Sequence, residues 1–260
     1  MTWEVLRGDC LQVLPTLEAG SVDAVITSPP YAEQRKKFYG GIPEAEYPAW
    51  TVVWMNEVKR ILKPQGSVLI NIREHVKDGQ ISDYVHKTRL ALRAAGWCEC
   101  DELIWVKPSS PPVGHPRRPR RSWERILWFS PSSRPWCNPK ANGTPSKHVG
   151  MAYAPNAAAW VQQMGRGFKE GIARSRDYVT IGACEADGGH PAAYPVPLAA
   201  WMMRLVTPPG GAVLDPFCGS GSTGAAALEN GYEFIGIELN PEYIKLAEAR
   251  LNSQPARLAV

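Results

Sequence analysis

The chain has 260 residues, of which 44% are hydrophobic and 21% charged, and its formal net charge at pH 7 is +4. This length and apolar content allow a sizeable buried core, which excludes disorder as the main state and predicts one large domain or one domain with an insertion. No run of about 18 apolar residues occurs, and the N-terminus carries Glu4 and Asp9 where a signal peptide needs a positive segment followed by an apolar one. We therefore expect a soluble, intracellular protein with no membrane contact.

The first predicted elements form a βαβ unit. Residues 22–27 (VDAVIT) and 67–72 (SVLINI) are short, almost continuously apolar runs, typical of parallel strands that are buried on both faces. Between them, residues 47–62 carry a helical stripe of apolar side chains that ends before Pro64 and Gly66. The pattern predicts a helix that connects two parallel strands.

The middle of the chain has a different composition. Residues 97–107 and 123–129 predict two paired strands, and the prolines and arginines of residues 108–122 exclude a regular helix or a central strand between them. We expect an exposed loop there. Further on, many Gly, Pro and polar residues surround one helical pattern at 157–164, which indicates an inserted recognition region.

Positive charge is concentrated in this middle part. Residues 107–190 contain 13 Lys and Arg against 5 Asp and Glu, a net charge of +8. The guanidinium group binds phosphate oxygens in a bidentate fork, so an excess of Arg over Lys is typical of a surface that contacts phosphates. An ordinary solvated loop remains the alternative.

Regular patterns return toward the C-terminus, where helices and strands alternate again. Together with the first elements, they predict an α/β fold with a doubly wound, mostly parallel sheet covered by helices on both faces. The predicted helices are 195–206, 222–230 and 241–251, and the predicted strands are 212–215 and 233–238.

The strand at 212–215 leads into a glycine-rich turn, DPFCGSGSTG (residues 215–224). Such a turn lets the backbone approach a ligand closely, which suits a nucleotide-like cofactor. Its glycines satisfy GxGxxG, a weak pattern that a dinucleotide site would share, with Glu238 on a ribose hydroxyl. A nicotinamide oxidoreductase is nevertheless disfavoured, because the turn comes so late in the chain that few strands follow it.

A second motif, TSPPY (residues 27–31), directly follows the first predicted strand. Two successive prolines end the strand and hold its last carbonyl groups in fixed directions. In an open parallel sheet, ligands bind in the crevice at the carboxyl ends of the strands. Because the glycine-rich turn follows another strand, we expect both motifs at this edge.

The two motifs together resemble those of DNA amino-methyltransferases that use S-adenosylmethionine. Their order, with TSPPY early, a basic stretch in the middle and DPFCGSGST late, resembles the β group of that family, whose Rossmann-like fold is circularly permuted. The segment Gly8-Asp9-Cys10 resembles the family's segment near the cofactor adenine. The resemblance implies catalytic roles for Ser28, Pro29, Pro30 and Tyr31, and cofactor binding by Asp9, Cys10, Asp215, Phe217, Gly219, Gly221, Thr223 and Glu238.

The chemistry of an exocyclic amine accounts for these residue types. Its lone pair is delocalised into the base, and hydrogen bonds from the amine to the Ser28 side chain and the Pro29 carbonyl would redirect it toward the methyl group. Tyr31 would stack on the base, which must first leave the duplex. The spacing of cysteines and histidines indicates no metal site, so we expect none.

The resemblance also implies an organisation and a set of partners. We expect catalytic residues in 1–107, an inserted target-recognition region in 108–190 and cofactor-binding residues in 191–260. The expected partner is double-stranded DNA with one flipped base, together with a cognate restriction endonuclease, and the protein is expected as a monomer or homodimer in the cytoplasm of a prokaryote or encoded by a phage. Four arginines are expected to contact the DNA: Arg117, Arg118, Arg120 and Arg121.

The first position of the tetrad bears on the target base. In the family, Ser at this position usually accompanies cytosine and Asp or Asn usually accompanies adenine, so Ser28 favours methylation of the cytosine N4 amine. Methylation of the adenine N6 amine, an RNA methyltransferase and a catalytically silent nucleic-acid-binding relative remain alternatives.

Overall fold

The computed structural model describes residues 2–33, 41–109, 117–145, 171–183 and 194–254. The chain divides into two compact units, one made of Met1–Cys137 with Asp177–Val260 and one made of Asn138–Arg176. The helix expected at 157–164 lies outside the described residues. No helix in the described part of the chain is long and apolar enough to cross a membrane.

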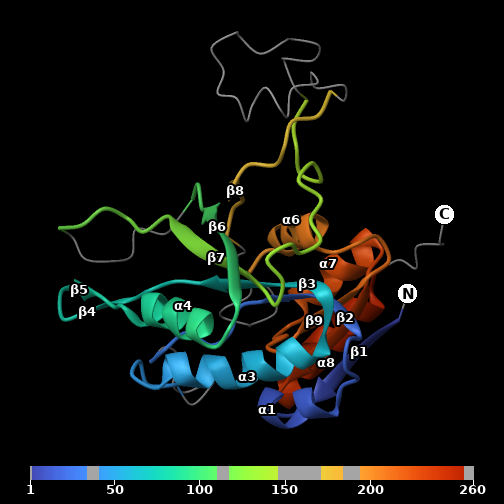
Figure 1. Cartoon of the computed structure of the whole chain (residues 1–260), viewed down its shortest axis with the longest axis horizontal. Coiled ribbons are helices and arrows are strands. Elements are labelled where there is room, and N and C mark those ends of the chain that lie inside the picture. The colour runs from blue at the N-terminus through green and yellow to red at the C-terminus, as the bar shows by residue number, and fades with distance from the viewer. Residues whose placement is uncertain (1, 34–40, 110–116, 146–170, 184–193, 255–260) are drawn as a thin grey trace. The chain divides into compact units, whose positions relative to one another are not determined.

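The larger unit is built on a single eight-stranded sheet within the described residues (Figure 1). Every neighbouring pair is parallel except the two pairs that involve β7, which runs antiparallel to both of its neighbours. The expected mostly parallel sheet is therefore confirmed. From one edge to the other the strands are β1 (Trp3–Arg7), β10 (Glu233–Glu238), β9 (Ala212–Asp215), β2 (Val22–Thr27), β3 (Leu62–Ile72), β7 (Trp123–Ser130), β6 (Cys98–Val106) and β8 (Tyr178–Thr180).

Helices pack against both faces of this sheet (Figure 1). One buried cluster joins α1, α3 and α4 to one face, and the other joins α6, α7 and α8 to the opposite face. This double covering explains why every residue of β2 is buried. The helices are α1 (Cys10–Val13), α3 (Tyr47–Ile61), α4 (Tyr84–Ala94), α6 (Val196–Val206), α7 (Ser222–Asn230) and α8 (Pro241–Asn252), with a 3₁₀ turn η1 (Leu14–Thr16).

The longest of these helices, α3, shows why the βαβ unit forms. A proline in its first turn fits a position where the missing N–H costs nothing. Its apolar stripe buries Trp54, Met55 and Val58 completely, and each such side chain contributes about 1.5–3 kcal/mol of burial free energy. The helix ends at Ile61, and β3 begins at once at Leu62, five residues earlier than the apolar run at 67–72 predicts.

The expected strand pair in the middle of the chain is also confirmed, since β6 and β7 pair antiparallel. The described residues between them, 107–109 and 117–122, contain no helix or strand. Because β7 lies inside the sheet, the region expected as an insertion at 108–190 contributes a strand to the main fold.

Other elements carry no clear sequence pattern. The strand β1, the helix α4 and the edge strand β8 were not expected, and neither was a small hairpin of β4 (Val76–Lys77) and β5 (Gln80–Ile81). The two residues between its strands, Asp78 and Gly79, both have positive φ, as a tight hairpin turn requires.

The smaller unit contains a short antiparallel contact. Pro145 and Ile172 form an isolated bridge, and the Ala173 N–H donates to the Thr144 carbonyl at 2.9 Å. A Cβ atom on Gly143 would lie 1.9 Å from the Ala173 carbonyl oxygen, so only glycine fits this close approach.

Candidate active site

The two sequence motifs meet at the carboxyl edge of the sheet, on the neighbouring strands β2 and β9. Thr27 ends β2 and Asp215 ends β9, and the Thr27 hydroxyl donates a hydrogen bond to Asp215 Oδ1 at 2.6 Å. Both residues are buried. The structure therefore brings the segment Ser28–Tyr31 and the glycine-rich turn together, as expected from their places after two strands.

Asp215 is held by uncharged donors. The Phe217 N–H donates to Oδ1 at 3.0 Å, and the Thr223 hydroxyl donates to Oδ2 while also hydrogen-bonding to Tyr194. Burial raises the pKa of Asp215 to about 6, and these hydrogen bonds oppose the rise only in part. The nearby charge of Glu238 adds to the rise. An ionised Asp215 is therefore poised to accept a partner of positive charge.

Glu238, at the end of β10, organises the glycine-rich turn. Its two carboxylate oxygens accept hydrogen bonds from the Gly219 and Asn240 N–H groups, each at 2.8 Å. Burial raises the pKa of this carboxyl as well. In the same turn the buried Ser220 hydroxyl has no hydrogen-bond partner among the described residues. An unpaired hydroxyl beside two carboxylates fits a turn that receives a polar ligand.

The glycines of this turn are required by backbone geometry. Gly219 has a φ of 53° and Gly221 has a φ of 82°, in the left-handed region that other residues rarely adopt. A Cβ atom on Gly221 would also lie 3.0 Å from the Ala247 Cα of helix α8. The turn therefore packs tightly against α8 on one side and presents backbone groups on the other.

Asp9 and Cys10 follow β1, whose last residue, Arg7, is in register with Glu238. Asp9 caps helix α1, because its Oδ1 accepts a hydrogen bond from the Leu11 N–H at 2.9 Å. Burial and the Asp9 carboxylate raise the pKa of Cys10 to about 12, so its thiol stays protonated. Both residues lie at the same edge as the turn.

An aromatic cluster lines the turn on the α3 side. The Phe217 ring lies 5.5 Å from the ring of Trp50 and 5.4 Å from that of Trp54, measured between centroids. Both are tilted or edge-on contacts, which aromatic rings prefer to face-to-face stacking. Helix α3 thus holds Phe217 in place beside Asp215.

Tyr31, the last residue of TSPPY, is fixed through its hydroxyl. The hydroxyl donates to Glu124 Oε2 at 2.8 Å and accepts from Asn71 Nδ2 at 3.1 Å. Burial raises the pKa of Tyr31 well above its usual value, and the Glu124 charge adds to this, whereas a hydrogen bond with the Ser28 side chain opposes it. Ser28 and Tyr31 therefore lie together, and the phenol is neutral at physiological pH.

Glu124 is the residue that sequence reasoning missed at this site. Burial alone would raise its pKa, but the charge of Lys107 and hydrogen bonds from Lys107, Asn71 and Tyr31 lower it. The Lys107 ammonium group contacts Glu124 Oε1. Asn71, Lys107 and Glu124 are each a polar residue beside the end of an apolar strand pattern, and that was the available signal.

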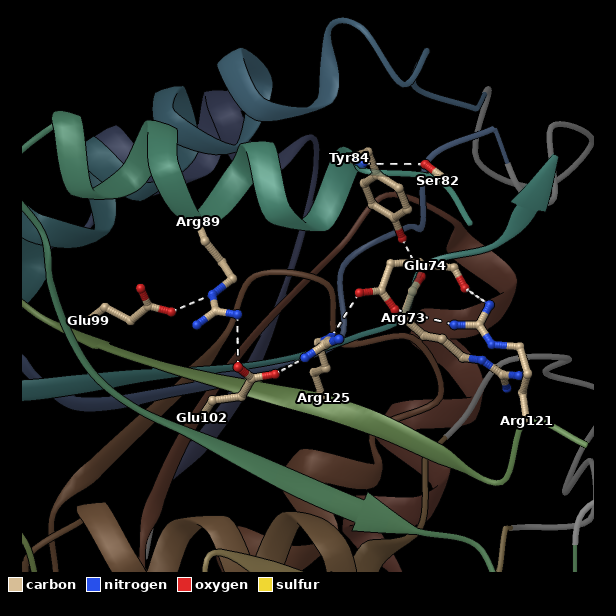
Figure 2. A network of polar contacts seen from close by, with 9 residues as sticks. All are labelled: Arg73, Glu74, Ser82, Tyr84, Arg89, Glu99, Glu102, Arg121 and Arg125. Atoms are coloured by element: carbon tan, nitrogen blue, oxygen red, sulfur yellow. Dashed lines mark hydrogen bonds and ion pairs between the residues drawn. The ribbon is translucent and has the colours of Figure 1, made fainter. Parts of the chain in front are cut away.

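The four arginines expected to contact DNA differ from one another. Arg117 and Arg120 are exposed, and Arg118 donates to the Gly79 carbonyl at the hairpin tip. Arg121 is partly buried and donates to both the carbonyl and the carboxylate of Glu74 (Figure 2). Its position indicates a structural role.

Glu74 also connects Arg121 to a longer row of ion pairs (Figure 2). Arg125 contacts Glu74 Oε1 at 2.8 Å and also pairs with Glu102, which in turn pairs with Arg89 at 2.8 Å. Arg89 ends the row on Glu99 at 2.5 Å. These alternating charges join β7, β6 and α4 to the segment that follows β3.

Among the described residues, no group of three or more His, Cys, Asp or Glu side chains is arranged to hold a metal ion. The described cysteines are free thiols: Cys10, Cys98, Cys100, Cys137 and Cys218.

The chain is similar in sequence to type II DNA modification enzymes over most of its length. Type II methyltransferase M.XycI of Xanthomonas campestris pv. cyanopsidis is 28% identical, over 96% of this chain and 88% of that protein. Type II methyltransferase M.PvuII of Proteus hauseri is 26% identical, over 94% of this chain and 82% of that protein.

Solved structures share the fold. The PvuII DNA methyltransferase (cytosine-N4-specific) matches with a TM-score of 0.75 and 23% identity, covering 100% of this chain and 89% of that one. A DNA modification methylase of Thermus thermophilus, complexed with S-adenosyl-L-methionine, matches with a TM-score of 0.64 and 23% identity, covering 96% and 95%. The family model described as DNA methylase, which unites N6 and N4 methyltransferases, matches residues 22–249. The chain therefore belongs to the N6/N4 DNA methylase family.

Proposed function

We propose that this protein transfers a methyl group from S-adenosylmethionine to the N4 amine of a cytosine in double-stranded DNA. The observation that carries the proposal is the 2.6 Å hydrogen bond between Thr27 and Asp215, which joins the TSPPY segment to the glycine-rich turn. Ligands of open parallel sheets bind at this edge. A base held at Ser28–Tyr31 and a cofactor held at the turn would lie side by side.

The charges at the turn support S-adenosylmethionine as the cofactor. It supplies a reactive methyl group on a positively charged sulfur. Asp215 and Glu238 are buried carboxylates with raised pKa values, so a cation bound nearby is favourable and a phosphate is not. A nicotinamide dinucleotide carries two phosphates and fits less well. The residues proposed to hold the cofactor are Asp9, Cys10, Asp215, Phe217, Gly219, Gly221, Thr223 and Glu238.

The TSPPY segment would prepare the base. The Ser28 hydroxyl and the Pro29 carbonyl accept hydrogen bonds from the exocyclic amine and draw its lone pair out of conjugation with the ring. Pro30 keeps the backbone rigid, so these acceptors need no reorganisation during the reaction. The Tyr31 ring contacts the face of the base. As the nitrogen gains the methyl group, it loses one proton.

The substrate would be duplex DNA with the target cytosine turned out of the helix, because the amine cannot reach a buried site while it is paired. Sequence recognition is assigned to the basic region 108–190, in which Arg117, Arg118 and Arg120 contact phosphates. The similarity to type II methyltransferases supports a cognate restriction endonuclease as a partner.

Two observations favour cytosine as the target. Ser28 stands at the tetrad position where relatives that modify cytosine usually carry serine. The structural relative with a TM-score of 0.75 is named as cytosine-N4-specific. Adenine, with its N6 amine, is the second candidate, because the same Pro-Pro-Tyr geometry serves both amines.

Mass spectrometry of nucleosides tests the proposal. The protein is expressed in a bacterial host that lacks its own DNA methylation, and the host DNA is digested to nucleosides. We expect N4-methyldeoxycytidine with the native chain and none with the Ser28→Ala variant. Detection of N6-methyldeoxyadenosine alone would replace cytosine by adenine. A folded native chain that yields neither nucleoside would refute the activity.

A further inference from the structure

We propose that Glu124 is a positioning residue for methyl transfer: its carboxylate, anchored by Lys107, fixes the Tyr31 hydroxyl and thereby the orientation of the Tyr31 ring against the target base. This inference rests on the proposed function and deepens it. Glu124 lies only 7% exposed among side chains of four neighbouring strand ends.

The sheet places Glu124 between its partners. Glu124 is the second residue of β7, in register with Trp105 of β6, and Lys107 follows the end of β6. On the other side β7 pairs with β3, which carries Asn71. Tyr31 follows β2, the next strand in the sheet. A single side chain therefore connects the ends of β6, β7, β3 and β2.

Hydrogen bonds close a triangle around the Tyr31 hydroxyl. The hydroxyl donates to Glu124 Oε2 at 2.8 Å and accepts from Asn71 Nδ2 at 3.1 Å. Asn71 Nδ2 also donates to Glu124 Oε2, at 2.9 Å. The tip of the ring cannot move without breaking at least two hydrogen bonds in a buried place, where lost hydrogen bonds are costly.

Lys107 keeps the anchor charged. Its ammonium group contacts Glu124 Oε1 and lies 4.1 Å from the centroid of the Trp105 ring, which holds the lysine in place. Arg73 adds a second positive charge, with its Nη1 4.0 Å from Oε1. An ionised carboxylate only accepts hydrogen bonds, so the Tyr31 hydroxyl must donate to it. The direction of the O–H bond is thus defined.

Both oxygens of Glu124 are occupied by side chains of this chain. Lys107 takes Oε1, and Tyr31 with Asn71 takes Oε2. Glu124 therefore acts on the base through Tyr31. The consequence is measurable: removing the Tyr31 hydroxyl should make the chemistry insensitive to what stands at position 124.

A double-mutant cycle tests this coupling. Native protein, Glu124→Gln, Tyr31→Phe and the double variant are compared for methyl transfer from tritiated S-adenosylmethionine into unmethylated phage DNA, with kcat and KM measured separately. We expect each single variant to lose about ten-fold in kcat, the value of one or two hydrogen bonds, with the KM for the cofactor unchanged within about two-fold. The double variant should lose no more than either single variant.

The matched control is Glu102→Gln, which removes a carboxylate from the neighbouring strand β6. Glu102 pairs with Arg89 and Arg125 and has no contact with Tyr31. We expect a native kcat from it, which shows that loss of an ion pair in this sheet does not by itself reduce the rate.

Three results would overturn the inference: multiplicative losses in the double variant, a native kcat in Glu124→Gln, or an equal loss in Glu102→Gln. If Glu124→Gln does not fold, Tyr31→Phe alone decides, since a native kcat without the hydroxyl excludes any role for its partner. Failure of the proposed function has a different signature, because the native protein itself would then transfer no methyl group.

Discussion

Two buried carboxylates lie on the same edge of the sheet, and their surroundings shift their pKa values in opposite directions. Asp215 is held by hydroxyl and N–H donors, and burial raises its pKa to about 6. Glu124 is also buried, but Lys107 and its hydrogen-bond partners lower its pKa. Burial therefore does not decide the charge of a carboxyl group at this site. The charge of the donors decides it.

The difference separates two tasks. At the glycine-rich turn, the uncharged donors that hold Asp215 leave its charge uncompensated, so a cationic ligand completes the site. At Tyr31, charge is compensated internally by Lys107, so the carboxylate only orients its neighbour. One half of the edge is built to bind and the other half is built to stay rigid. The predictions below test this contrast.

The largest effect is expected at the rigid half. Replacing Ser28 by Ala should lower kcat by about 10²–10³, the cost of one preorganised hydrogen bond in the transition state. Binding of S-adenosylmethionine, measured by calorimetry, should stay within a few-fold, because Ser28 is not on the turn. Ser21→Ala, at the amino end of the same strand, is the control and should keep native kcat. A fully active Ser28→Ala protein would remove Ser28 from the site.

The next effect is on stability. The folded-state pKa of Asp215, about 6, is above its reference value of 3.8, so folding favours the protonated form. This contribution is fully present below pH 3.8 and is lost as the pH rises to about 6, at a cost of about 3 kcal/mol. Asp215→Asn should therefore be more stable than the native protein at pH 8, by an amount that shrinks toward pH 4. Its cofactor affinity should fall.

Glu124→Gln should behave in the opposite way. The folded-state pKa of Glu124 is lowered, so its contribution is present above the reference value of 4.5 and is lost as the pH falls through the folded-state value. This variant should be less stable than the native protein at pH 8, and the difference should narrow in acid. Chemical denaturation of both variants at pH 5 and pH 8 checks the pair. Shifts of the same sign would contradict the contrast between the two carboxylates.

The arginine-rich segment allows the same kind of separation. The Arg121 guanidinium, bound to Glu74 in a partly buried position, is expected to stabilise the fold. Arg121→Gln should lower the free energy of unfolding by about 1.5–3 kcal/mol, the range for hydrogen bonds to charged groups. Arg120→Gln, at an exposed neighbouring position, should change it by less than about 0.5 kcal/mol. Urea unfolding compares the two, and equal losses would refute the structural role of Arg121.

The buried strands and the two motifs could be predicted because each is a local pattern. Fully buried strands such as β2 and β9 appear as continuous apolar runs, and a glycine-rich turn is readable within ten residues. The Glu124 network is not local. Its members are 17 and 53 residues apart along the chain and meet only through strand pairing, which a single sequence does not reveal. The hairpin has an Asp78-Gly79 turn, but its two-residue strands carry no pattern.

The smallest effect concerns the exposed arginines and DNA. Each phosphate contact that is lost should flatten the slope of log affinity against log salt by about one unit. Replacing Arg117 and Arg120 together by Gln should therefore reduce the slope by about two units, measured by fluorescence anisotropy with a labelled duplex. Lys87→Gln with Lys245→Gln removes the same charge from exposed positions on α4 and α8, where each lysine pairs with an acidic neighbour. That control should leave the slope nearly unchanged, because non-contacting charges release no counterions from the duplex. If both pairs flatten the slope equally, the arginines act only through net charge, and the DNA-contacting surface lies elsewhere in the basic region.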